Sequence, residues 1–444
     1  MSLVTVRRAL IVAFLATLLS ACGGRGSSAP PPVGGLTVTP GDGQVVVTWT
    51  PDPGVEYWLF YAPTTYISTD SLSGVPGLKG LISVTTPLIL PSLVNGQLYS
   101  FTLDGRYDGG PGGPGTPSVS ATPRLAGTSW TAGGAMGSAD MRGVAWGAIT
   151  PAGAATSSNY YLAAGAGGAL YQSTDGVTTA GLNWTQNTTS GITANLNAAV
   201  YTLGKFIVVG DLGTISSSAD LATWSAGTSV NNTQNLNAVA SNGARVVAVG
   251  DGGLIEYSGD GISWTAATSV PAGTPNLYGV SYLSSGLWMA VGQNCTLLSS
   301  SDGSTWTTVP VPACSATDLT GVAYRGASTT TVTIPTTTTT SIAASYVLVG
   351  KGGLVLSSPD AVTWTAQTSN TTANLLTISS VPNQFLAVGA GGAAITSPDG
   401  LTWTAQNTSS GGPASTLYGL SNAQGQYVAV GGTGSGTGTS LFSR

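Results

Sequence analysis

The sequence predicts an all-β protein in which a small β-sandwich precedes a seven-bladed β-propeller. A motif of the form S-x-D-G-x-T-W recurs about every 40 residues through the last three quarters of the 444-residue chain. Each period also holds four short runs of Val, Ile, Leu and Tyr that are separated by Gly-rich turns. Four short strands per repeat of this length are typical of a propeller blade.

The first 22 residues predict export. Arg7 and Arg8 precede an apolar run, residues 9–19, that is too short to span a bilayer. The run leads into Leu19-Ser20-Ala21-Cys22, which resembles the lipobox of bacterial lipoproteins. The resemblance implies a signal peptide over residues 1–21, lipid chains on Cys22 and, because Gly23 follows, sorting to the outer membrane. An ordinary cleaved signal peptide is the alternative, and the leaflet that exposes the protein stays open.

Residues 22–32 are rich in Gly, Ser and Pro and predict a flexible tether. Residues 33–124 carry alternating strand-like runs and predict a separate domain. Trp49 resembles the core tryptophan of a fibronectin type III module, and the spacing of Leu93, Gly96 and Tyr99 resembles its tyrosine-corner strand. The resemblance implies a β-sandwich that serves as a spacer.

Residues 125–444 hold the repeats. The carboxyl-terminal residues 417–444 supply three strands of a further blade but stop where a fourth strand should follow. Gly127-Thr128-Ser129-Trp130 matches that fourth strand, so the two ends should complete a seventh blade together and remove free sheet edges. The six complete repeats end at Trp184, Trp224, Trp264, Trp306, Trp364 and Trp403.

The repeated motif predicts a structural role for its aspartates. An Asp can accept backbone N–H groups across a tight turn, a Gly permits positive φ, and a Trp fills space between blades. The motif resembles the Asp-box, or BNR repeat, of bacterial sialidases and the repeats of photosystem II assembly and stability factors. The second resemblance implies a non-catalytic seven-bladed propeller. The box aspartates are Asp175, Asp220, Asp260, Asp302, Asp360 and Asp399.

Composition excludes several functions. The chain contains no histidine, which removes His-based triads and His metal sites, and we expect neither a metal nor a cofactor. Charged residues make up 7% of the chain, and its net charge is −5. No Lys/Arg cluster exists beyond Arg7 and Arg8, which speaks against nucleic-acid binding.

Catalysis on glycans is the rival hypothesis. Sialidases need an arginine cluster and a Tyr paired with a Glu, whereas Glu256 is the one Glu of the repeat region and an Arg-Ile-Pro start motif is absent. Two facing carboxylates could still hydrolyse a glycoside. We predict that the protein is not an enzyme. The aspartates left to form such a pair are Asp140, Asp211, Asp251 and Asp318.

One face of the predicted ring is the candidate binding surface. In a propeller, the turns between second and third strands share a face with the loops that join blades. Of the variable turn residues, Asp211, Asp251, Gln293 and Lys351 are the candidates for binding. The variable residues in chain order are Ala166, Asp211, Asp251, Gln293, Lys351, Ala390 and Gly432.

Three cysteines fit an exported protein. Cys22 accounts for the odd one, and Cys295 and Cys314 should pair in an oxidising compartment. Both fall on the candidate face of one blade, which makes a disulfide geometrically reasonable. The Thr-rich segment 328–341 predicts a surface insertion, either a projecting ribbon or a glycosylated loop.

These observations together predict a monomeric, non-catalytic envelope lipoprotein. Its lipid anchor contacts the membrane, and its propeller face binds a protein or polysaccharide partner in assembly, adhesion or scaffolding. A glycan-active propeller enzyme and a purely structural envelope protein remain the alternatives.

Overall fold

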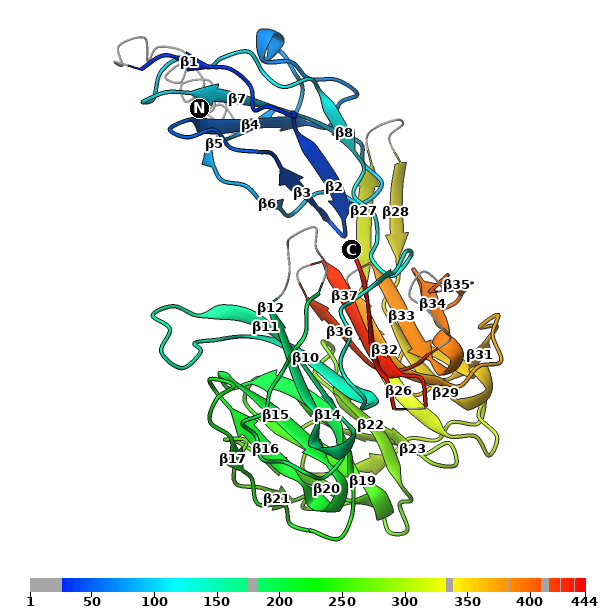
Figure 1. Ribbon diagram of the computed structural model, residues 1–444. Coiled ribbons are helices and arrows are strands. Elements are labelled where there is room, and N and C mark those ends of the chain that lie inside the picture. Colours follow the sequence, from blue (N-terminus) through cyan, green and yellow to red (C-terminus); the bar gives the residue numbers. More distant parts are fainter. Residues whose placement is uncertain are drawn as a thin grey trace, which may run out of the picture. The chain divides into compact units, whose positions relative to one another are not determined.

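The computed structural model describes residues 26–174, 182–332, 338–381, 383–408, 415–423, 425–434 and 436–444. Among these residues the protein is built from β-strands, and its helical structure is limited to short 3-10 turns (Figure 1). None of the described helices has the length and hydrophobicity needed to span a membrane. Three predicted features lie outside the described residues: the signal peptide, the lipidation of Cys22 and the first box aspartate, Asp175.

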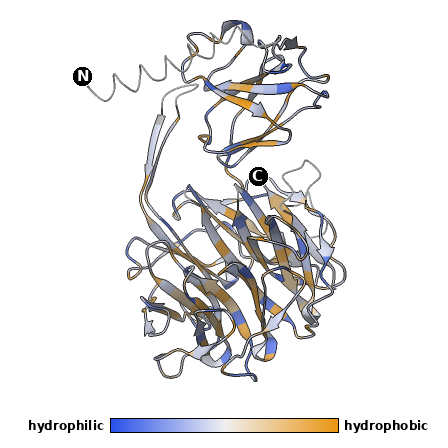
Figure 2. Cartoon of the chain, turned by 90° about the vertical axis from the view of Figure 1, so that its left-hand side faces the viewer, coloured by the Kyte–Doolittle hydropathy of each residue, from blue (hydrophilic) through white to orange (hydrophobic). Residues whose placement is uncertain are grey.

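The chain forms two compact units. One comprises Met1–Arg124 and the short stretch Thr331–Thr339, and the other comprises Leu125–Thr330 and Thr340–Arg444. Hydrophobic residues are distributed along the strands of both units (Figure 2). This distribution follows from the two-residue period of a strand, which sends alternate side chains to opposite faces.

The first unit has two antiparallel sheets. The smaller sheet has the order β2-β3-β6, with β2 (Thr37–Gly41), β3 (Gln44–Thr48) and β6 (Leu88–Leu90). The larger has the order β1-β7-β4-β5, and β8 also pairs with β7. Its strands are β1 (Ser28–Ala29), β4 (Glu56–Ala62), β5 (Lys79–Val84), β7 (Tyr99–Arg106) and β8 (Val119–Ala121), and η1 (Thr69–Ser71) is a 3-10 turn.

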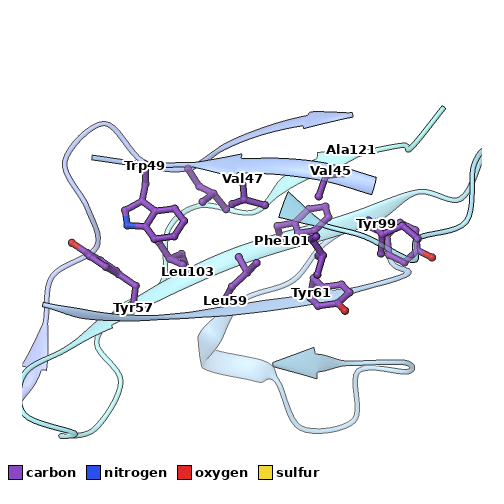
Figure 3. Packing of buried hydrophobic residues seen from close by; sticks show 13 residues of the cluster. Val45, Val47, Trp49, Tyr57, Leu59, Tyr61, Tyr99, Phe101, Leu103 and Ala121 are labelled. Atoms are coloured by element: carbon purple, nitrogen blue, oxygen red, sulfur yellow. The ribbon is translucent and has the colours of Figure 1, made fainter. Parts of the chain in front are cut away.

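A single hydrophobic core lies between these two sheets (Figure 3). Trp49 meets Tyr57 edge to face, with ring centroids 5.7 Å apart. Val47 from β3 and Leu59 and Phe101 from the larger sheet are completely buried against them. Burial of this many large side chains is the main term that stabilises a domain of about 100 residues.

The second unit contains, among its described residues, seven four-stranded antiparallel sheets, numbered here in chain order. The first is β10 (Met141–Ile149), β11 (Ser158–Gly165), β12 (Leu170–Thr174) and β13 (Thr185–Gln186). The second is β14 (Leu196–Thr202), β15 (Lys205–Gly210), β16 (Ile215–Ser218) and β17 (Ser225–Ala226). The third is β18 (Leu236–Ser241), β19 (Val246–Gly250), β20 (Ile255–Ser258) and β21 (Thr265–Ala266).

The remaining four sheets repeat this pattern. The fourth is β22 (Leu277–Tyr282), β23 (Trp288–Gly292), β24 (Leu297–Ser300) and β25 (Thr307–Thr308). The fifth is β26 (Leu319–Arg325), β29 (Ser345–Gly350), β30 (Val355–Ser358) and β31 (Thr365–Gln367). The sixth is β32 (Leu375–Val381), β33 (Gln384–Gly389), β34 (Ala394–Ser397) and β35 (Thr404–Ala405), and the seventh is β36 (Thr416–Ala423), β37 (Gln426–Gly432), β38 (Gly438–Ser443) and β9 (Thr131–Ala132).

The first strands of the seven sheets form a closed ring. Each contacts the first strand of the next sheet, and β36 of the last sheet contacts β10 of the first. The seventh sheet joins distant parts of the chain, because its outer strand is β9, which pairs Ala132 with Leu441 and Thr131 with Phe442. The two ends of the second unit therefore share one sheet, and the ring has no open edge.

Between the second and third strands, five sheets make a short 3-10 turn. The edge of the ring that carries these turns and the loops between sheets is called the rim edge below. The opposite edge, with the turns between third and fourth strands, is the Asp-box edge. The five turns are η2 (Ala166–Gly168), η3 (Asp211–Gly213), η4 (Asp251–Gly253), η5 (Lys351–Gly353) and η6 (Ala390–Gly392).

The fifth sheet carries an insertion on its Asp-box edge. The Thr-rich segment between β26 and β29 forms a two-stranded ribbon of β27 (Ser328–Val332) and β28 (Thr338–Ile342). Hydroxyl groups pair across it, Thr329 with Ser341 and Thr331 with Thr339, both at 3.1 Å. Of the two conformations left open by the sequence, the described residues adopt the ribbon.

Candidate functional site: the rim edge and the channel mouth

The carboxylates of the repeated S-x-D-G-x-T-W motif accept hydrogen bonds from groups of their own turns. Asp302 Oδ1 accepts hydrogen bonds from the backbone N–H of Ser304 at 2.8 Å and Thr305 at 2.9 Å, and from Ser300 Oγ at 2.9 Å. The other described boxes repeat this arrangement, at Asp220, Asp260, Asp360 and Asp399.

Hydrogen bonds to the charged form lower the pKa of these carboxyls. The N–H of Ile262, followed by that of Ser263, lowers the pKa of Asp260 to about 2. The same kind of backbone bond, first from Thr305, holds the pKa of Asp302 well below its usual range. These carboxylates remain ionised at neutral pH and fasten the turns, as the sequence predicts for a structural motif.

A box of the same geometry is split between the two ends of the second unit. The backbone N–H of Gly127 donates to Ser443 Oγ at 2.7 Å, just as the N–H of Gly303 donates to Ser300 Oγ at 2.8 Å. The indole Nε1 of Trp130 donates to the carbonyl of Gly127 at 3.0 Å, matching the bond from Trp306 to Gly303 at 3.3 Å. The closing sheet thus rebuilds the serine, glycine and tryptophan of the motif, with Ala126 where the other boxes hold Asp.

The ring encloses a central channel of about 660 Å³. The first strands of all seven sheets line it, mainly with Gly, Ala, Val, Ser and Thr. Small residues are required there because the strands approach closely: a Cβ on Gly143 would lie 2.7 Å from the backbone nitrogen of Ala199. Among the described residues that line the channel, Arg142 is the one with a charge.

Seven side chains of five residue types surround the mouth of this channel at the rim edge. In six sheets the first strand begins at a buried Leu or Met, and in the seventh the buried Leu417 is the second residue of β36. The residue after each Leu or Met falls on a register shift in the pairing with the second strand. All seven residues after the shift line the channel. We call them the rim residues: Arg142, Asn197, Asn237, Tyr278, Thr320, Leu376 and Tyr418.

Asp211 and Asp251, two of the sequence-predicted site residues, lie behind the rim residues in amide clamps. Asp211 accepts one hydrogen bond from Asn195 and another from Asn197, both at 2.8 Å. Asp251 is held in the same way in the next sheet, by Asn235 at 3.0 Å and Asn237 at 2.9 Å. Both carboxylates therefore have their oxygens engaged by the fold.

A hydrogen-bonded row connects the channel mouth with one of these clamps. Arg142 Nη1 donates to Asn197 Oδ1 at 2.7 Å, and Asn197 Nδ2 donates to Asp211 Oδ1 at 2.8 Å. The carboxylate of Asp211 thus orients the amide of Asn197, whose oxygen in turn orients the guanidinium. A preoriented cation at the mouth of an otherwise uncharged channel favours an anionic group there.

Lys351 and Gln293 occupy the rim edge further round the ring. Lys351 Nζ lies 2.6 Å from Asp318 Oδ2 and 5.8 Å from the ring centroid of Tyr278. The hydrogen bond lowers the pKa of Asp318 and raises that of Lys351. Gln293 lies in the turn after β23, where its backbone N–H donates to the carbonyl of Asn276 at 2.9 Å. Gly432 lies within β37 rather than in the turn that follows.

None of the candidate catalytic carboxylates is hydrogen-bonded to another in the described residues. Asp211 and Asp251 are clamped by amides and Asp318 pairs with Lys351, while Asp140 lies beside the backbone of Gly432. The described residues also contain no group of three His, Cys, Asp or Glu side chains that could hold a metal ion.

Sequence analysis missed a repeated latch between sheets. In five of the seven sheets, the residue before the first strand accepts, through its side-chain oxygen, a backbone N–H from the turn of the preceding sheet: Asn195 takes that of Gly167 at 2.8 Å, and Asn235 that of Leu212 at 3.1 Å. The signal was present in the sequence as an Asn-Leu or Asp-Leu pair at the start of these five strands. The further latches are Asn276 with Gly252, Asp318 with Asn294, and Asn374 with Gly352.

Cys295 and Cys314 are joined by a disulfide that reinforces the rim edge, with their Cα atoms 5.8 Å apart. Cys295 belongs to the turn after β23, and Cys314 to the loop that leads into β26. The bridge therefore ties the fourth sheet to the loop entering the fifth, parallel to the Asp318 latch at the same junction.

Comparison with solved structures supports the fold. The chain is similar to YCF48 bound to D1 peptide, with a TM-score of 0.52, 17% identity, and coverage of 70% of this chain and 96% of the other. The WD40 β-propeller domain of Doa1 gives 0.52 and 11%, covering 71% and 97%. YCF48 from Cyanidioschyzon merolae gives 0.49 and 14%, covering 70% and 98%. No protein-family model and no curated protein matches the sequence. At these identities the likeness concerns the fold alone, and it is that of a β-propeller.

Proposed function

We propose that this protein is a non-catalytic binding lipoprotein of the bacterial envelope, in which a seven-bladed Asp-box propeller binds a protein partner across its rim edge. The observation that carries the proposal is the contrast between the two edges. On the Asp-box edge, blade after blade repeats a turn in which the Asp carboxylate accepts N–H groups of the same turn. The seven rim residues, in contrast, differ in size, charge and hydrogen-bonding capacity. Variation on a rigid, repeating frame is where binding specificity resides in such folds.

Chemistry at the channel mouth favours a protein segment with an acidic group. Arg142 is held by Asn197 and has no carboxylate partner among the described residues, while Tyr278 and Tyr418 offer ring faces and hydroxyls. Aromatic residues and Arg are the residue types that contribute most to binding energy at protein interfaces. A structurally similar propeller, YCF48, has been seen bound to D1 peptide, which supports a peptide segment as the ligand.

The first unit acts in this proposal as a fibronectin type III-like spacer. Its three-stranded and five-stranded sheets enclose Trp49, and the hydroxyl of Tyr99 accepts the backbone N–H of Val94 at 3.2 Å, as in a tyrosine corner. A lipidated Cys22 and a Gly/Ser/Pro tether would hold this unit at the membrane, and the protein would act as a monomer.

Proximity crosslinking in the native host tests the proposal. The full-length protein would be compared with a rim variant, Arg142→Gln with Tyr418→Ser, and with a control variant on the Asp-box edge. The control is Val362→Ser with Leu401→Ser, two residues that are well exposed there. We expect the rim variant to lose its main protein partner by about tenfold or more in crosslinked yield, and the control to keep it. An identical partner list from all three proteins would overturn the proposal.

A further inference from the structure

The rim-edge turn of the second blade holds a leucine in a backbone conformation that leucine disfavours. Leu212 has φ 53° and ψ 41°, in the left-handed region. The other 3-10 turns place glycine at this position, because glycine has no Cβ to clash in that conformation. Leu212 therefore destabilises its own turn relative to the glycine of its neighbours. The equivalent glycines are Gly167, Gly252, Gly352 and Gly391.

Packing does not compensate for this strain. The Leu212 side chain is 63% exposed, the highest value for a large hydrophobic residue of the second unit's rim edge. The same blade has two more leucines with positive φ, and they differ from Leu212. Leu221 (φ 59°) is 5% exposed and packs in the core, and Leu203 (φ 53°), in the turn between β14 and β15 on the Asp-box edge, is 38% exposed.

The turn around Leu212 is rigidly held on both sides. The N–H of Leu212 donates to Asn235 Oδ1 at 3.1 Å, and the N–H of Gly213 donates to the carbonyl of Gln234 at 2.7 Å. Asp211, just before it, is fixed by Asn195 and Asn197. A leucine displayed on such a preorganised turn loses little further entropy on binding.

This turn is also connected to the charged channel mouth. The row Arg142–Asn197–Asp211 ends at the residue before Leu212, so one continuous set of hydrogen bonds joins the cation and the exposed leucine. The loop that receives the turn carries a second exposed apolar residue, Val230, at 44%. One sector of the rim edge thus offers a cation and an apolar projection together.

We propose that Leu212 is the apolar anchor of the partner site, and that the partner is a protein segment pairing apolar side chains with a carboxylate. The carboxylate complements Arg142, the one charged side chain among the described residues of the channel, and the apolar side chains pack around Leu212. A polysaccharide is the poorer occupant, since Leu212 provides neither a hydrogen bond nor an aromatic face to a sugar. The inference rests on the proposed binding function of the rim edge.

The test is Leu212→Gly in the full-length protein, with Leu203→Gly as matched control. Both variants relieve a left-handed leucine, so both should unfold at the same temperature as the wild type or above it. Crosslinked yield of the main protein partner should fall at least about fivefold for Leu212→Gly and stay unchanged for Leu203→Gly.

Four outcomes would count against the anchor. A lowered unfolding temperature for Leu212→Gly would give the leucine a structural role instead. Equal loss of partner in both glycine variants would show that the effect does not come from the rim edge. Wild-type capture by Leu212→Gly, together with loss in the Arg142→Gln/Tyr418→Ser variant, would refute the anchor and leave the proposed function standing. Wild-type capture by both would refute the proposed function as well.

Discussion

Glu256 differs from every other carboxylate in the described propeller. Its side chain is completely buried on β20, where Leu298, Leu356 and Ile395 occupy the same place in other blades. Oε2 accepts the N–H of Val230 at 2.8 Å and the hydroxyl of Ser229 at 3.1 Å, while Oε1 is buried and accepts no hydrogen bond from a described residue. Desolvation by this burial raises the pKa of Glu256, despite the two hydrogen bonds that lower it.

This environment predicts a pH dependence of stability. Because the folded-state pKa lies above the ordinary value of 4.5, the folded protein binds the proton more tightly than the unfolded chain does. The contribution of Glu256 to stability is therefore greatest below about pH 4.5 and is lost as the pH rises through the folded-state pKa. Glu256→Gln keeps an acceptor for Val230 and Ser229 but cannot ionise, so the loss should disappear in that variant.

Unfolding temperatures of the propeller between about pH 5 and pH 8 would measure the effect. Each kcal/mol corresponds to roughly 2–4 °C for a domain of this size. Glu56→Gln, in the first unit, is the control and should leave the propeller transition unchanged. Parallel pH curves for wild type and Glu256→Gln would contradict the prediction.

At the residue scale, the sequence predicted the roles of repeated residues better than those of single ones. Ser300, Asp302 and Trp306 recur as a motif, and a motif identifies which groups act together. Asp211 and Asp251 are candidates in the sequence because they carry charge on the rim edge. Their clamping amides lie 14 and 16 residues away in the sequence, so the pairing became visible only with the register of the strands.

At the element scale, the turn after β23 departs from the others. It has Asn294 at φ 55° and Cys295 at φ 60°, where four other blades place a pair of glycines, such as Gly252 and Gly253. Asparagine tolerates the left-handed region, but cysteine gains nothing there except its bond to Cys314. The disulfide therefore compensates for an unfavourable backbone conformation as well as closing a loop.

Two double variants separate these contributions. Cys295→Gly/Cys314→Ser and Cys295→Ala/Cys314→Ser both lose the bridge, which closes a loop of about 20 residues and stabilises by roughly 3 kcal/mol in the loop-entropy model. The free energy of unfolding should be about 1 kcal/mol higher for the glycine variant than for the alanine variant. The reason is that alanine, unlike glycine, is destabilised in the left-handed conformation. Denaturant unfolding measures both differences.

Mass spectrometry of the unreduced wild type should first show the peptides of Cys295 and Cys314 joined. Free thiol at either residue would show that the disulfide does not form. An alanine variant as stable as the glycine variant would show that the turn relaxes once the bond is gone.

The sequence locates the ribbon of the fifth blade but does not identify the residue that supports it. The Thr-rich run identified an insertion, yet the residue that fixes it is Arg325, which is 2% exposed. Its guanidinium donates to the carbonyl of Gly326 and to Ser328 Oγ at 3.0 Å, and to the carbonyl of Ala343 at 2.8 Å. One buried cation thus holds both ends of the ribbon, and a lone Arg in a sequence carries no sign of such a role.

At the scale of the whole propeller, stability depends on the closing sheet. Deleting residues 439–444 would remove nearly all of β38, leave β9 without its partner and expose the edge of β37. We expect the entire propeller to unfold at a lower temperature, by more than 10 °C as an order of magnitude, because every blade needs two neighbours. Ser443→Ala, which removes one hydrogen bond to Gly127, should cost about 1 kcal/mol.

Circular dichroism on both proteins would check this expectation. Because the deletion removes a strand and the point variant removes only a bond, the first should broaden or abolish the cooperative transition and the second should merely shift it. Unchanged stability of the deletion protein would mean that the ring does not depend on this closure.

Much of the propeller architecture followed from the period of about 40 residues, since a blade is a unit that the sequence repeats. The split blade could also be predicted from the sequence, because Trp130 belongs to none of the six complete repeats. The channel mouth was not accessible, since its seven side chains come from seven blades and share only their place after a Leu or Met near the start of the first strand. Only the ring places Arg142 and Tyr278 around one opening.

The split blade also determines how the propeller would respond to mechanical load. Tension applied to the chain before Leu125 reaches the ring through β9, which is paired with β38 at two positions and is preceded by the bond from Gly127 to Ser443. The force therefore acts on the seventh blade before it reaches any other blade. A pull between the chain before Leu125 and the rim edge would therefore separate β9 from the seventh blade first, while the six blades with continuous chain stay folded.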